Sequence, residues 1–341
     1  MEVCGEFEHK TVLITGATGL IGYNFVKLLI SNTDTCIVLA CGRNAERLSE
    51  TFSEFQFEER LKLIEHDITQ ASFTDKQINL LDYIFHAAGP QEREIVINNP
   101  LEVIQANFDG LTICLKYLVG QEKRTGHAGR AIIFSSLTIY GNPSYDELLT
   151  VMESDSDRTA SLSDVTSSYS ESKRMSEVLA SAYQKMFGVD FVVCRLSTIF
   201  GYSKNPSNTA FFEFLGLAQN GKNIQVGQKH GPKRDNLYVK DAVAGLLYGA
   251  AFGASGEVYN ISSNGDKDNL ISVGQIAVLI AELANKHIHL SNKVKVTYSD
   301  ESYHPPKGMM LDNTKLKSLN WTINYSFREA IIDLFNQNRS K

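Results

Sequence analysis

The chain has 341 residues, and its 33 lysines and arginines against 39 aspartates and glutamates give a formal net charge of −6. This acidic balance, without a run of basic residues, argues against a nucleic-acid-binding surface. The longest nearly apolar run, Ala242–Ala254, has thirteen residues with three glycines and is too short to span a bilayer. The acidic start lacks the apolar stretch of a secretion signal. We therefore expect one large or two unequal domains in the cytoplasm, with no nucleic acid and no membrane among the partners.

The cysteine pattern is typical of the same compartment. The count is odd and no C-x-x-C pair occurs, so the spacing indicates neither a disulfide framework nor a metal-binding motif. All five are expected to be structural thiols: Cys4, Cys36, Cys41, Cys114 and Cys194. His287 and His289 would share one face of a strand, but no third ligand accompanies them, and we expect no metal site.

Short β-branched runs alternate with helical patterns in the first part of the chain, which predicts β-α-β units and a parallel sheet. Six runs are expected to be buried strands: Thr11–Thr15, Cys36–Ala40, Leu61–Glu65, Tyr83–His86, Ala131–Ser135 and Phe191–Leu196. Three segments are expected to be helices: Gly22–Ser31, Pro100–Val119 and Ser170–Phe187. The polar stretch Glu153–Ser168 predicts a surface loop. Beyond Gly201 the alternation weakens, which indicates a second, smaller lobe.

A glycine-rich turn joins the first predicted strand to the first predicted helix. Gly16, Gly19 and Gly22 have the spacing that permits a tight turn, a close backbone approach to a pyrophosphate, and close packing of helix on strand. The start of the helix then offers unpaired N–H groups to an anion. Strand, turn and helix follow in the order that dinucleotide binding requires. The residues expected to contact the dinucleotide are Gly16, Thr18, Gly19, Leu20, Ile21 and Gly22.

The end of the second predicted strand bears on the choice between NAD and NADP. An acidic residue there would bind the ribose 2′-hydroxyl, whereas an arginine accommodates a 2′-phosphate. The chain has Gly42 followed by Arg43 and no carboxylate. This favours NADP over NAD, unless Arg43 is an ordinary solvated loop residue. Asp67 and Ile68, after the third strand, are placed to reach the adenine, although Asp67 would serve equally as a helix N-cap.

Tyr169 and Lys173 would lie on one face of the third predicted helix. A phenol has a pKa of about 10, and a neighbouring ammonium brings that pKa toward neutrality, so the pair suits proton transfer. Ser136 follows the fifth predicted strand, at the edge where open α/β sheets bind their ligands. Its hydroxyl could hydrogen-bond the same substrate oxygen that Tyr169 deprotonates.

Together these motifs resemble the extended short-chain dehydrogenase/reductase family, and within it the NAD(P)-dependent nucleotide-sugar epimerase/dehydratase branch. Five further segments in family order carry the resemblance: His86–Gly89, Ser135–Gly141, Tyr169–Lys173, Arg195–Gly201 and Arg234–Asp241. It implies an α/β fold, a Rossmann-type doubly wound parallel sheet with a smaller C-terminal substrate-binding lobe. We expect an NAD(P)-binding domain of residues 1–202 plus 236–263, and a nucleotide-sugar-binding lobe of residues 203–235 plus 264–341.

The resemblance also implies roles for individual residues. Ser136 would be the catalytic hydroxyl, Tyr169 the general base or acid, and Lys173 its partner at the nicotinamide ribose. Asn107 would support the site from behind, unless it only bonds backbone within its own helix. The cofactor wall would further include Ala87, Ala88 and Gly89. The substrate contacts would be Ser136, Thr138, Thr198 (where the family usually has Asn) and Arg234. Arg234 would bind the substrate pyrophosphate, unless it is an ordinary surface arginine.

The residues just after Ser136 bear on the reaction. In the family's dehydratases and decarboxylases acidic residues occupy this stretch, whereas here it holds Leu137 and Thr138. The Ser-x-Thr pattern resembles that of 4-epimerases and also suits a ketoreductase that consumes NADPH. We expect an NAD(P)-dependent nucleotide-sugar epimerase that acts at C4 through a 4-keto intermediate, with the reductase as the alternative and dehydration or decarboxylation disfavoured. A non-catalytic dinucleotide sensor on the same fold is an alternative from another class, which the presence of Tyr169 and Lys173 disfavours.

Two further expectations concern surfaces. The resemblance implies a homodimer formed through the helices that carry Asn107 and Tyr169. An apolar stripe on the first of these helices would either join the two subunits or face the sheet: Val103, Phe108, Leu111 and Leu115. The aromatic run Phe211–Phe214 would line the sugar pocket or, as its helical spacing favours, belong to the core.

Overall fold

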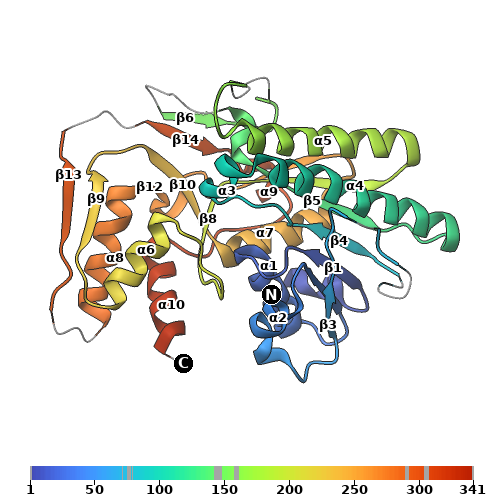
Figure 1. The fold of residues 1–341 in the computed structure, drawn as a ribbon, viewed down its shortest axis with the longest axis horizontal. Coiled ribbons are helices and arrows are strands. Elements are labelled where there is room, and N and C mark those ends of the chain that lie inside the picture. Colours follow the sequence, from blue (N-terminus) through green and yellow to red (C-terminus); the bar gives the residue numbers. More distant parts are fainter. Residues whose placement is uncertain are drawn as a thin grey trace.

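The computed structural model describes residues 2–70, 72–74, 78, 80–141, 148–156, 161–288, 292–302 and 307–339. Within these ranges, seven parallel strands form the central sheet in the order β3-β2-β1-β4-β5-β7-β11 (Figure 1). Their bounds are β1 Thr11–Thr15, β2 Ile37–Gly42, β3 Leu61–Glu65, β4 Tyr83–His86, β5 Arg130–Ser136, β7 Asp190–Leu196 and β11 Val258–Ile261. β2 and β3 extend the sheet on one side of β1, and β4 and the later strands extend it on the other side. The boundary between β1 and β4 is therefore the switch point at which doubly wound sheets bind ligands. The predicted fold class is confirmed.

The six predicted strands occur, with ends that shift by one or two residues at most. Five of them are buried as predicted, whereas the edge strand β3 is largely exposed beyond Leu61. The edge strand β11 was not predicted, because Asn260 interrupts its short apolar run. β11 nevertheless pairs with β7 along four residues, and Asn260 is completely buried there. Its polar atoms are satisfied within the protein, since the side chain accepts from the Tyr140 hydroxyl and donates to the Asp312 carbonyl.

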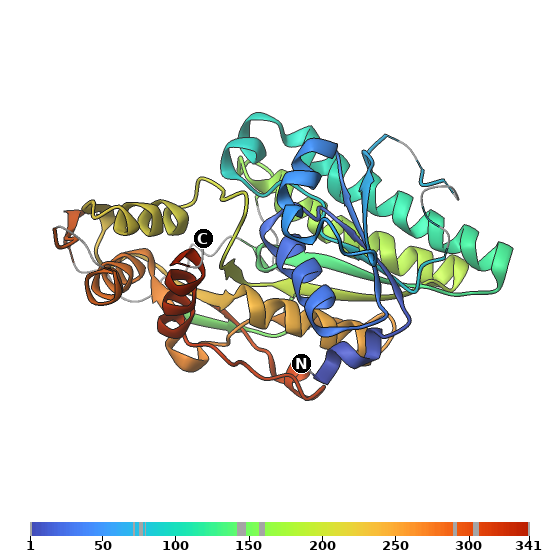
Figure 2. The same ribbon diagram turned by 90° about the horizontal axis from the view of Figure 1, so that it is seen from below.

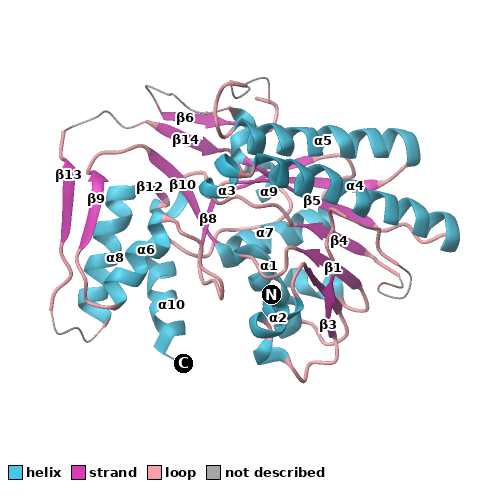
Figure 3. Cartoon of the chain, in the orientation of Figure 1, coloured by secondary structure: helices cyan, strands magenta, loops and turns pink. Residues whose placement is uncertain are grey.

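Alternate residues of the central strands face opposite sides of the sheet. Val12 and Ile14 belong to one hydrophobic core and Leu13 to the other. Helices of the first core are α1 Leu20–Asn32 and α7 Val239–Phe252, and helices of the second are α4 Pro100–Thr125 and α5 Ser167–Phe187. Figure 3 shows these helices on the two sides of the strands. Both faces of the inner strands are therefore covered, which explains why these strands are largely apolar, whereas the edge strand β3 carries exposed polar residues.

The three predicted helices are confirmed as α1, α4 and α5, each longer than predicted. α4 continues six residues past the predicted end at Val119, because Gln, Glu, Lys and Arg in this stretch are good helix formers. It ends at Gly126, whose φ of 74° is the left-handed conformation that glycine adopts without a steric penalty. Of the predicted loop Glu153–Ser168, residues 157–160 lie outside the described residues, and its last two residues already belong to α5.

Three of the four residues in the apolar stripe predicted on α4 are buried inside the subunit. Val103, Leu111 and Leu115 are completely buried, and Leu111 and Leu115 pack against strand residues of the second core. Phe108 is partly exposed. The three buried residues cannot also cover a partner. The apolar side chains exposed on α4 and α5 are others, among them Leu101, Ile104, Met175 and Val178.

Further strands lie outside the central sheet. β12 pairs with β10, β10 with β14 and β8, β14 with β6, and β9 with β13. Their bounds are β6 Leu148–Val151, β8 Thr198–Phe200, β9 Ile224–Gln228, β10 Lys233–Tyr238, β12 Leu270–Ser272, β13 Val296–Asp300 and β14 Gly308–Leu311. β8 and β10 stand beside the carboxyl end of β7, since β8 follows β7 after one residue. This small sheet therefore forms a second wall next to the switch point.

The other α-helices of the described residues are α2 Ala45–Thr51, α3 Arg93–Asn98, α6 Ala210–Gln219, α8 Val273–His287, α9 Thr314–Lys317 and α10 Phe327–Arg339. α2 packs on β2 and β3, and α3 packs on α4. α6 and α8 pack together and lie apart from the central sheet (Figure 2). α9 instead contacts α7 and β11. The indole N–H of Trp321 donates to the carbonyl of Asp241 on α7 at 3.1 Å. Because α10 packs on α8, the chain after α8 contacts both the helices beside the central sheet and the helices that lie apart from it.

All five cysteines are buried free thiols, as predicted. Burial raises the pKa of Cys36 and of Cys41 to about 12, which makes both unreactive near neutral pH. The strand expected around His287 was wrong, because this residue ends α8, and His289 lies outside the described residues. In the part of the chain that the structure describes, no cluster of His, Cys, Asp and Glu is arranged to hold a metal ion, and every helix is too short or too polar to cross a membrane.

Candidate active site

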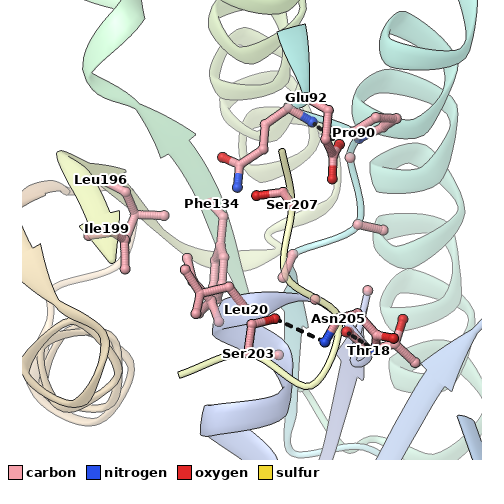
Figure 4. A pocket seen from close by; sticks show the side chains of 18 of the residues that line it. Thr18, Leu20, Pro90, Glu92, Phe134, Leu196, Ile199, Ser203, Asn205 and Ser207 are labelled. Carbon is pink, nitrogen blue, oxygen red and sulfur yellow. Dashed lines mark hydrogen bonds between the residues drawn. The ribbon is translucent and has the colours of Figure 1, made fainter. Parts of the chain in front are cut away.

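A cavity of about 560 Å³ lies at the carboxyl ends of the central strands (Figure 4). It brings together most of the predicted site residues. Those that line it are Gly16, Thr18, Gly19, Leu20, Ile21, Gly22, Arg43, Ile68, Ala87, Ala88, Gly89, Ser136, Tyr169, Lys173, Thr198 and Arg234. Asp67, Asn107 and Thr138 are not among the lining residues. Asp67 and Thr138 instead hydrogen-bond the lining residues Thr69 and Ser136, and Asn107 hydrogen-bonds Ser172 behind the cavity wall.

The glycine-rich loop has the close approaches that its sequence predicts. Gly16 has a φ of 65°, and a Cβ atom there would lie 2.9 Å from the carbonyl oxygen of Ala87. A Cβ atom on Gly22 would lie 2.5 Å from the Gly16 carbonyl oxygen, so α1 packs directly on the loop. The N-cap residue Gly19 has no side chain to cap the first turn, which leaves the N–H groups at Leu20 and beyond available to an anion. These residues fit the diphosphate of a dinucleotide.

The adenosine end of the cavity contains an ion pair. The guanidinium of Arg43 lies 2.7 Å from a carboxylate oxygen of Glu102, which comes from the first turn of α4. The other oxygen of Glu102 accepts a 2.7 Å hydrogen bond from Asn99. Arg43 therefore has a defined partner, although its side chain is 62% exposed. The carboxylate of Asp67 accepts from the backbone N–H and the hydroxyl of Thr69, so it caps a local turn.

Tyr169 and Lys173 stand on successive turns of α5, and both face the cavity. The Lys173 ammonium is buried, donates a 2.7 Å hydrogen bond to the Phe134 carbonyl, and lies 5.9 Å from the centre of the Tyr169 ring. Burial lowers the pKa of Lys173 to about 8. Burial also raises the pKa of Tyr169, while a hydrogen bond with Ser136 lowers it. The expected net lowering of the phenol pKa is thus absent, because desolvation outweighs the favourable contacts.

Ser136 ends β5, at the start of a short 3-10 turn, Leu137–Tyr140. Its oxygen accepts hydrogen bonds from the backbone N–H of Thr138 at 3.2 Å and from the Thr138 hydroxyl at 3.1 Å. A serine hydroxyl has two acceptor sites and one proton to donate. Because Thr138 occupies both acceptor sites, the Ser136 proton remains for the phenol of Tyr169 or for a bound oxygen.

Asn107 joins α4 to α5 behind this pair. Its Nδ2 atom donates a 2.9 Å hydrogen bond to the Ser172 hydroxyl, between Tyr169 and Lys173 in the chain. A Cβ atom on Gly89 would lie 2.5 Å from Asn107 Oδ1 and 3.7 Å from Lys173 Nζ. A side chain at position 89 would therefore clash with Asn107, and glycine allows the side chains of Asn107 and Lys173 to approach the backbone here.

A buried ion pair that was not predicted supports the same helix. Arg195 is 4% exposed, and two of its nitrogens contact the carboxylate of Glu177 at 3.1 Å and 2.7 Å. A third bond, at 2.9 Å, reaches the hydroxyl of Tyr140. Glu177 follows Lys173 by one helical turn, and this spacing is the signal that could have identified it. The pair ties α5 to β7 and to the turn after Ser136.

The small sheet and α6 form the remaining wall. Thr198 lies on β8, and Arg234 is exposed on β10 at the edge of the cavity. Both alternatives for the aromatic run occur, because Phe214 is buried in the core, and Phe211 and Phe212, which are partly exposed, line the cavity together with Phe214. Four lining residues after β8 were not predicted: Ser203, Asn205, Ser207 and Thr209. The segment is polar almost throughout, so no alternation in the sequence distinguishes these four residues from their neighbours.

A doubly wound sheet that gathers a diphosphate loop and a Ser–Tyr–Lys set at its switch point is the arrangement of an NAD(P)-binding short-chain dehydrogenase/reductase enzyme. The model of the NAD dependent epimerase/dehydratase family matches residues 12–262. The chain belongs to this family of enzymes.

Relatives from the family include enzymes of more than one reaction type. A dTDP-glucose 4,6-dehydratase from Escherichia coli is 27% identical over 342 residues, which cover 94% of this chain and 90% of the relative. An epimerase structure from Methanothermobacter thermautotrophicus has a TM-score of 0.79 at 21% identity and covers 100% of this chain and 96% of that one. A UDP-glucuronic acid 4-epimerase from Bacillus cereus, solved with UDP-glucuronic acid and NAD, has a TM-score of 0.75 at 20% identity, with 97% and 99% covered. At these identities the structures show the shared fold.

Proposed function

We propose that the protein is an NAD(P)-dependent nucleotide-sugar 4-epimerase. The observation that carries this proposal is the arrangement after Ser136. Thr138 hydrogen-bonds the catalytic hydroxyl, and Leu137 packs with Ile139 and Tyr140 in a small hydrophobic cluster. Neither residue can move a proton near neutral pH, so this stretch lacks the carboxylates that elimination of water or carbon dioxide would need. Oxidation and reduction of an alcohol need only the hydroxyl, the phenol and the ammonium.

The chain's own groups would act on the C4 hydroxyl of the sugar. Ser136 would donate a hydrogen bond to the C4 oxygen, and Tyr169 would take the proton of the C4 hydroxyl as the carbonyl forms. The buried ammonium of Lys173, charged below its pKa of about 8, stabilises the phenolate that results. A bound dinucleotide supplies the hydride acceptor at this edge of the sheet. After the 4-keto sugar rotates in the site, the hydride would return to the opposite face of C4, and Tyr169 would return its proton to the C4 oxygen.

Two alternatives have their own support. Arg43 at the end of β2 favours NADP, and an enzyme that takes up NADPH for each turnover would be a nucleotide-4-keto-sugar reductase. The Escherichia coli relative is a 4,6-dehydratase. Glu92, a carboxylate that lines the cavity and raises the pKa of Tyr169 by its charge, is the acidic group that such a reaction would have to use here.

One experiment separates these reactions. The purified protein is incubated in D₂O with UDP-glucose, UDP-glucuronic acid or dTDP-glucose, with and without added NAD or NADP, and the products are followed by NMR. An epimerase interconverts C4 epimers without deuterium at carbon and without net change of the dinucleotide. A dehydratase incorporates deuterium at C5, because the C5 proton is removed and replaced. A reductase leaves these sugars unchanged but oxidises NADPH when a 4-keto sugar is supplied. Tyr169→Phe is the control and should abolish each of these conversions.

We also propose a homodimer, a cytoplasmic location, and the predicted division at residues 202, 235 and 263. The exposed apolar side chains on the outer faces of α4 and α5 support a dimer through these helices, and the five buried thiols suit a reducing compartment. The packing of α6 with α8, apart from the central sheet, supports a separate sugar-binding lobe.

A further inference from the structure

A linking segment, residues 202–209, passes in front of the glycine-rich loop, and we name it the strap. It follows β8 and leads into α6. Ser203, Asn205, Ser207 and Thr209 line the cavity, whereas Pro206 and Asn208 between them are exposed and do not. Figure 4 shows Ser203, Asn205 and Ser207 along the strap, between the glycine-rich loop with Thr18 and the segment with Pro90 and Glu92.

Asn205 connects the strap to two other parts of the dinucleotide site. Its Nδ2 atom donates to the carbonyl oxygen of Thr18 at 3.2 Å and to the hydroxyl of Thr51 at 3.1 Å. Thr18 belongs to the glycine-rich loop, and Thr51 is a buried residue at the end of α2. One carboxamide thus joins the strap, the loop and the helix after β2.

The first half of the strap is fixed by further contacts. Asn24 of α1 donates a 2.8 Å hydrogen bond to the Tyr202 carbonyl. The ammonium of Lys204 lies 3.4 Å from the carboxylate of Glu54, which also accepts the phenolic hydrogen bond of the buried Tyr23. Because these anchors hold the chain on both sides of Ser203, the carboxamide of Asn205 is presented to the loop in one orientation.

We propose that Asn205 latches the strap across the glycine-rich loop, so that the dinucleotide is retained through many turnovers. The start of α1 would bind the diphosphate on one side. The hydroxyl groups of Ser203 and Ser207 offer uncharged donors on the other side. With the latch closed, the diphosphate lies between them, and the dinucleotide leaves only when the two Asn205 bonds break. This inference rests on the dinucleotide site of the proposed function.

Retention of this kind is what an epimerase requires, because the hydride must return from the same dinucleotide molecule that received it. The strap also continues directly into α6, whose Phe211 and Phe212 line the substrate side of the cavity. Movement of α6 when a nucleotide sugar binds or leaves would therefore be transmitted to the latch through a few residues of extended chain.

The test measures how fast the dinucleotide dissociates. NADH and NADPH are bound to the full-length protein and displaced with excess NAD or NADP in a stopped-flow fluorimeter. Asn205→Ala removes both latch bonds, and we expect dissociation to accelerate about tenfold, the effect of one to two hydrogen bonds. Thr51→Val keeps the side-chain volume but loses one acceptor and should give a smaller acceleration. Asn208→Ala, at an exposed asparagine of the same strap, is the matched control and should match the wild type.

The outcomes separate the latch from the reaction. Acceleration in Asn205→Ala with unchanged melting temperature supports the latch, since a merely structural defect would lower the melting temperature. Dissociation rates within twofold of the Asn208→Ala control overturn it. A wild-type protein that retains its dinucleotide by this latch but converts no nucleotide sugar supports the latch and contradicts the proposed epimerase. A wild-type protein that binds neither NADH nor NADPH contradicts both.

Discussion

The hydroxyl of Thr138 donates a 3.1 Å hydrogen bond to the oxygen of Ser136. With the backbone N–H of Thr138 it fills both acceptor sites of the serine, which leaves the Ser136 proton for the substrate oxygen. Thr138→Val keeps the size of the side chain but loses this bond. We expect kcat to fall about tenfold with little change in KM, because one orienting hydrogen bond is lost. Steady-state kinetics measures both constants. The control variant Thr138→Ser keeps the hydroxyl and should retain most of the wild-type rate. Equal rates for the valine and serine variants would contradict this role.

The buried ammonium of Lys173 makes stability depend on pH. Its pKa is about 8 in the folded protein and about 10.5 in the unfolded chain, so between these values the unfolded chain binds the proton more tightly. The free energy of unfolding should therefore rise with pH across this window, by up to about 3 kcal/mol, and the full cost of the buried charge remains below pH 8.

Lys173→Met should remove this rise and should unfold at higher urea concentration than the wild type at pH 7, while turnover is lost. Urea denaturation at pH 7 and pH 9.5 measures both effects. Lys116→Met, at an exposed lysine of α4, is the matched control and should keep the wild-type pH dependence. A methionine variant that is less stable than the wild type at pH 7 would show that the buried ammonium does not destabilise the folded protein.

The ion pair between Arg43 and Glu102 bears on the dinucleotide preference. The carboxylate of Glu102, 2.7 Å from the guanidinium of Arg43, competes with a 2′-phosphate for the guanidinium N–H groups. It also places a negative charge next to that phosphate. We expect Glu102→Gln to strengthen NADPH binding about tenfold and to leave NADH binding within twofold, since hydrogen bonds to charged groups are the stronger ones. Fluorescence titration gives both dissociation constants. Glu94→Gln, at an exposed glutamate of α3, should change neither. A parallel change for both dinucleotides would exclude a role in their discrimination.

The ion pair between Glu177 and Arg195 should be expensive to break. Glu177→Ala leaves the guanidinium of Arg195 buried without its carboxylate, which typically costs about 3–5 kcal/mol. Glu171→Ala breaks a 3.8 Å surface pair with Arg174 on the same helix, and we expect a loss of about 0.5 kcal/mol or less. Urea denaturation of the two alanine variants makes the comparison, and similar midpoints would contradict a supporting role for the buried pair.

The proposed homodimer is testable at its exposed apolar side chains. Ile104 and Val178 are 40% and 58% exposed on α4 and α5. Glutamate at both positions should give a folded monomer, because a charge in the centre of an apolar interface is costly to desolvate. Light scattering after gel filtration measures the mass. Phe57→Glu, at a side chain that is 90% exposed after α2, is the control and should leave the mass unchanged. A wild-type protein that is already monomeric would exclude the dimer.

Local patterns in the chain were sufficient for six of the seven strands described in the central sheet and for the diphosphate loop. The buried strands are apolar on both faces, and the glycines at 16, 19 and 22 stand where a Cβ would meet backbone, so each signal lies within a few consecutive residues. β11 was not predicted, because a polar Asn260 is not expected in a buried strand. Its hydrogen-bond partners Tyr140 and Asp312 are distant in the sequence, so no local pattern shows that Asn260 can be buried.

The sequence by itself indicated the family, most strands of the central sheet, and the pair of Tyr169 and Lys173, because these depend on short motifs and short-range spacing, and the resemblance to the family added Ser136. Only the tertiary structure decided that Glu102 meets Arg43, that Arg195 pairs with Glu177, and that Asn205 reaches the glycine-rich loop. Each of these contacts joins residues that are separated by many positions. Their geometry follows from how helices and loops pack around the sheet, and side-chain packing is set by the whole fold rather than by local sequence.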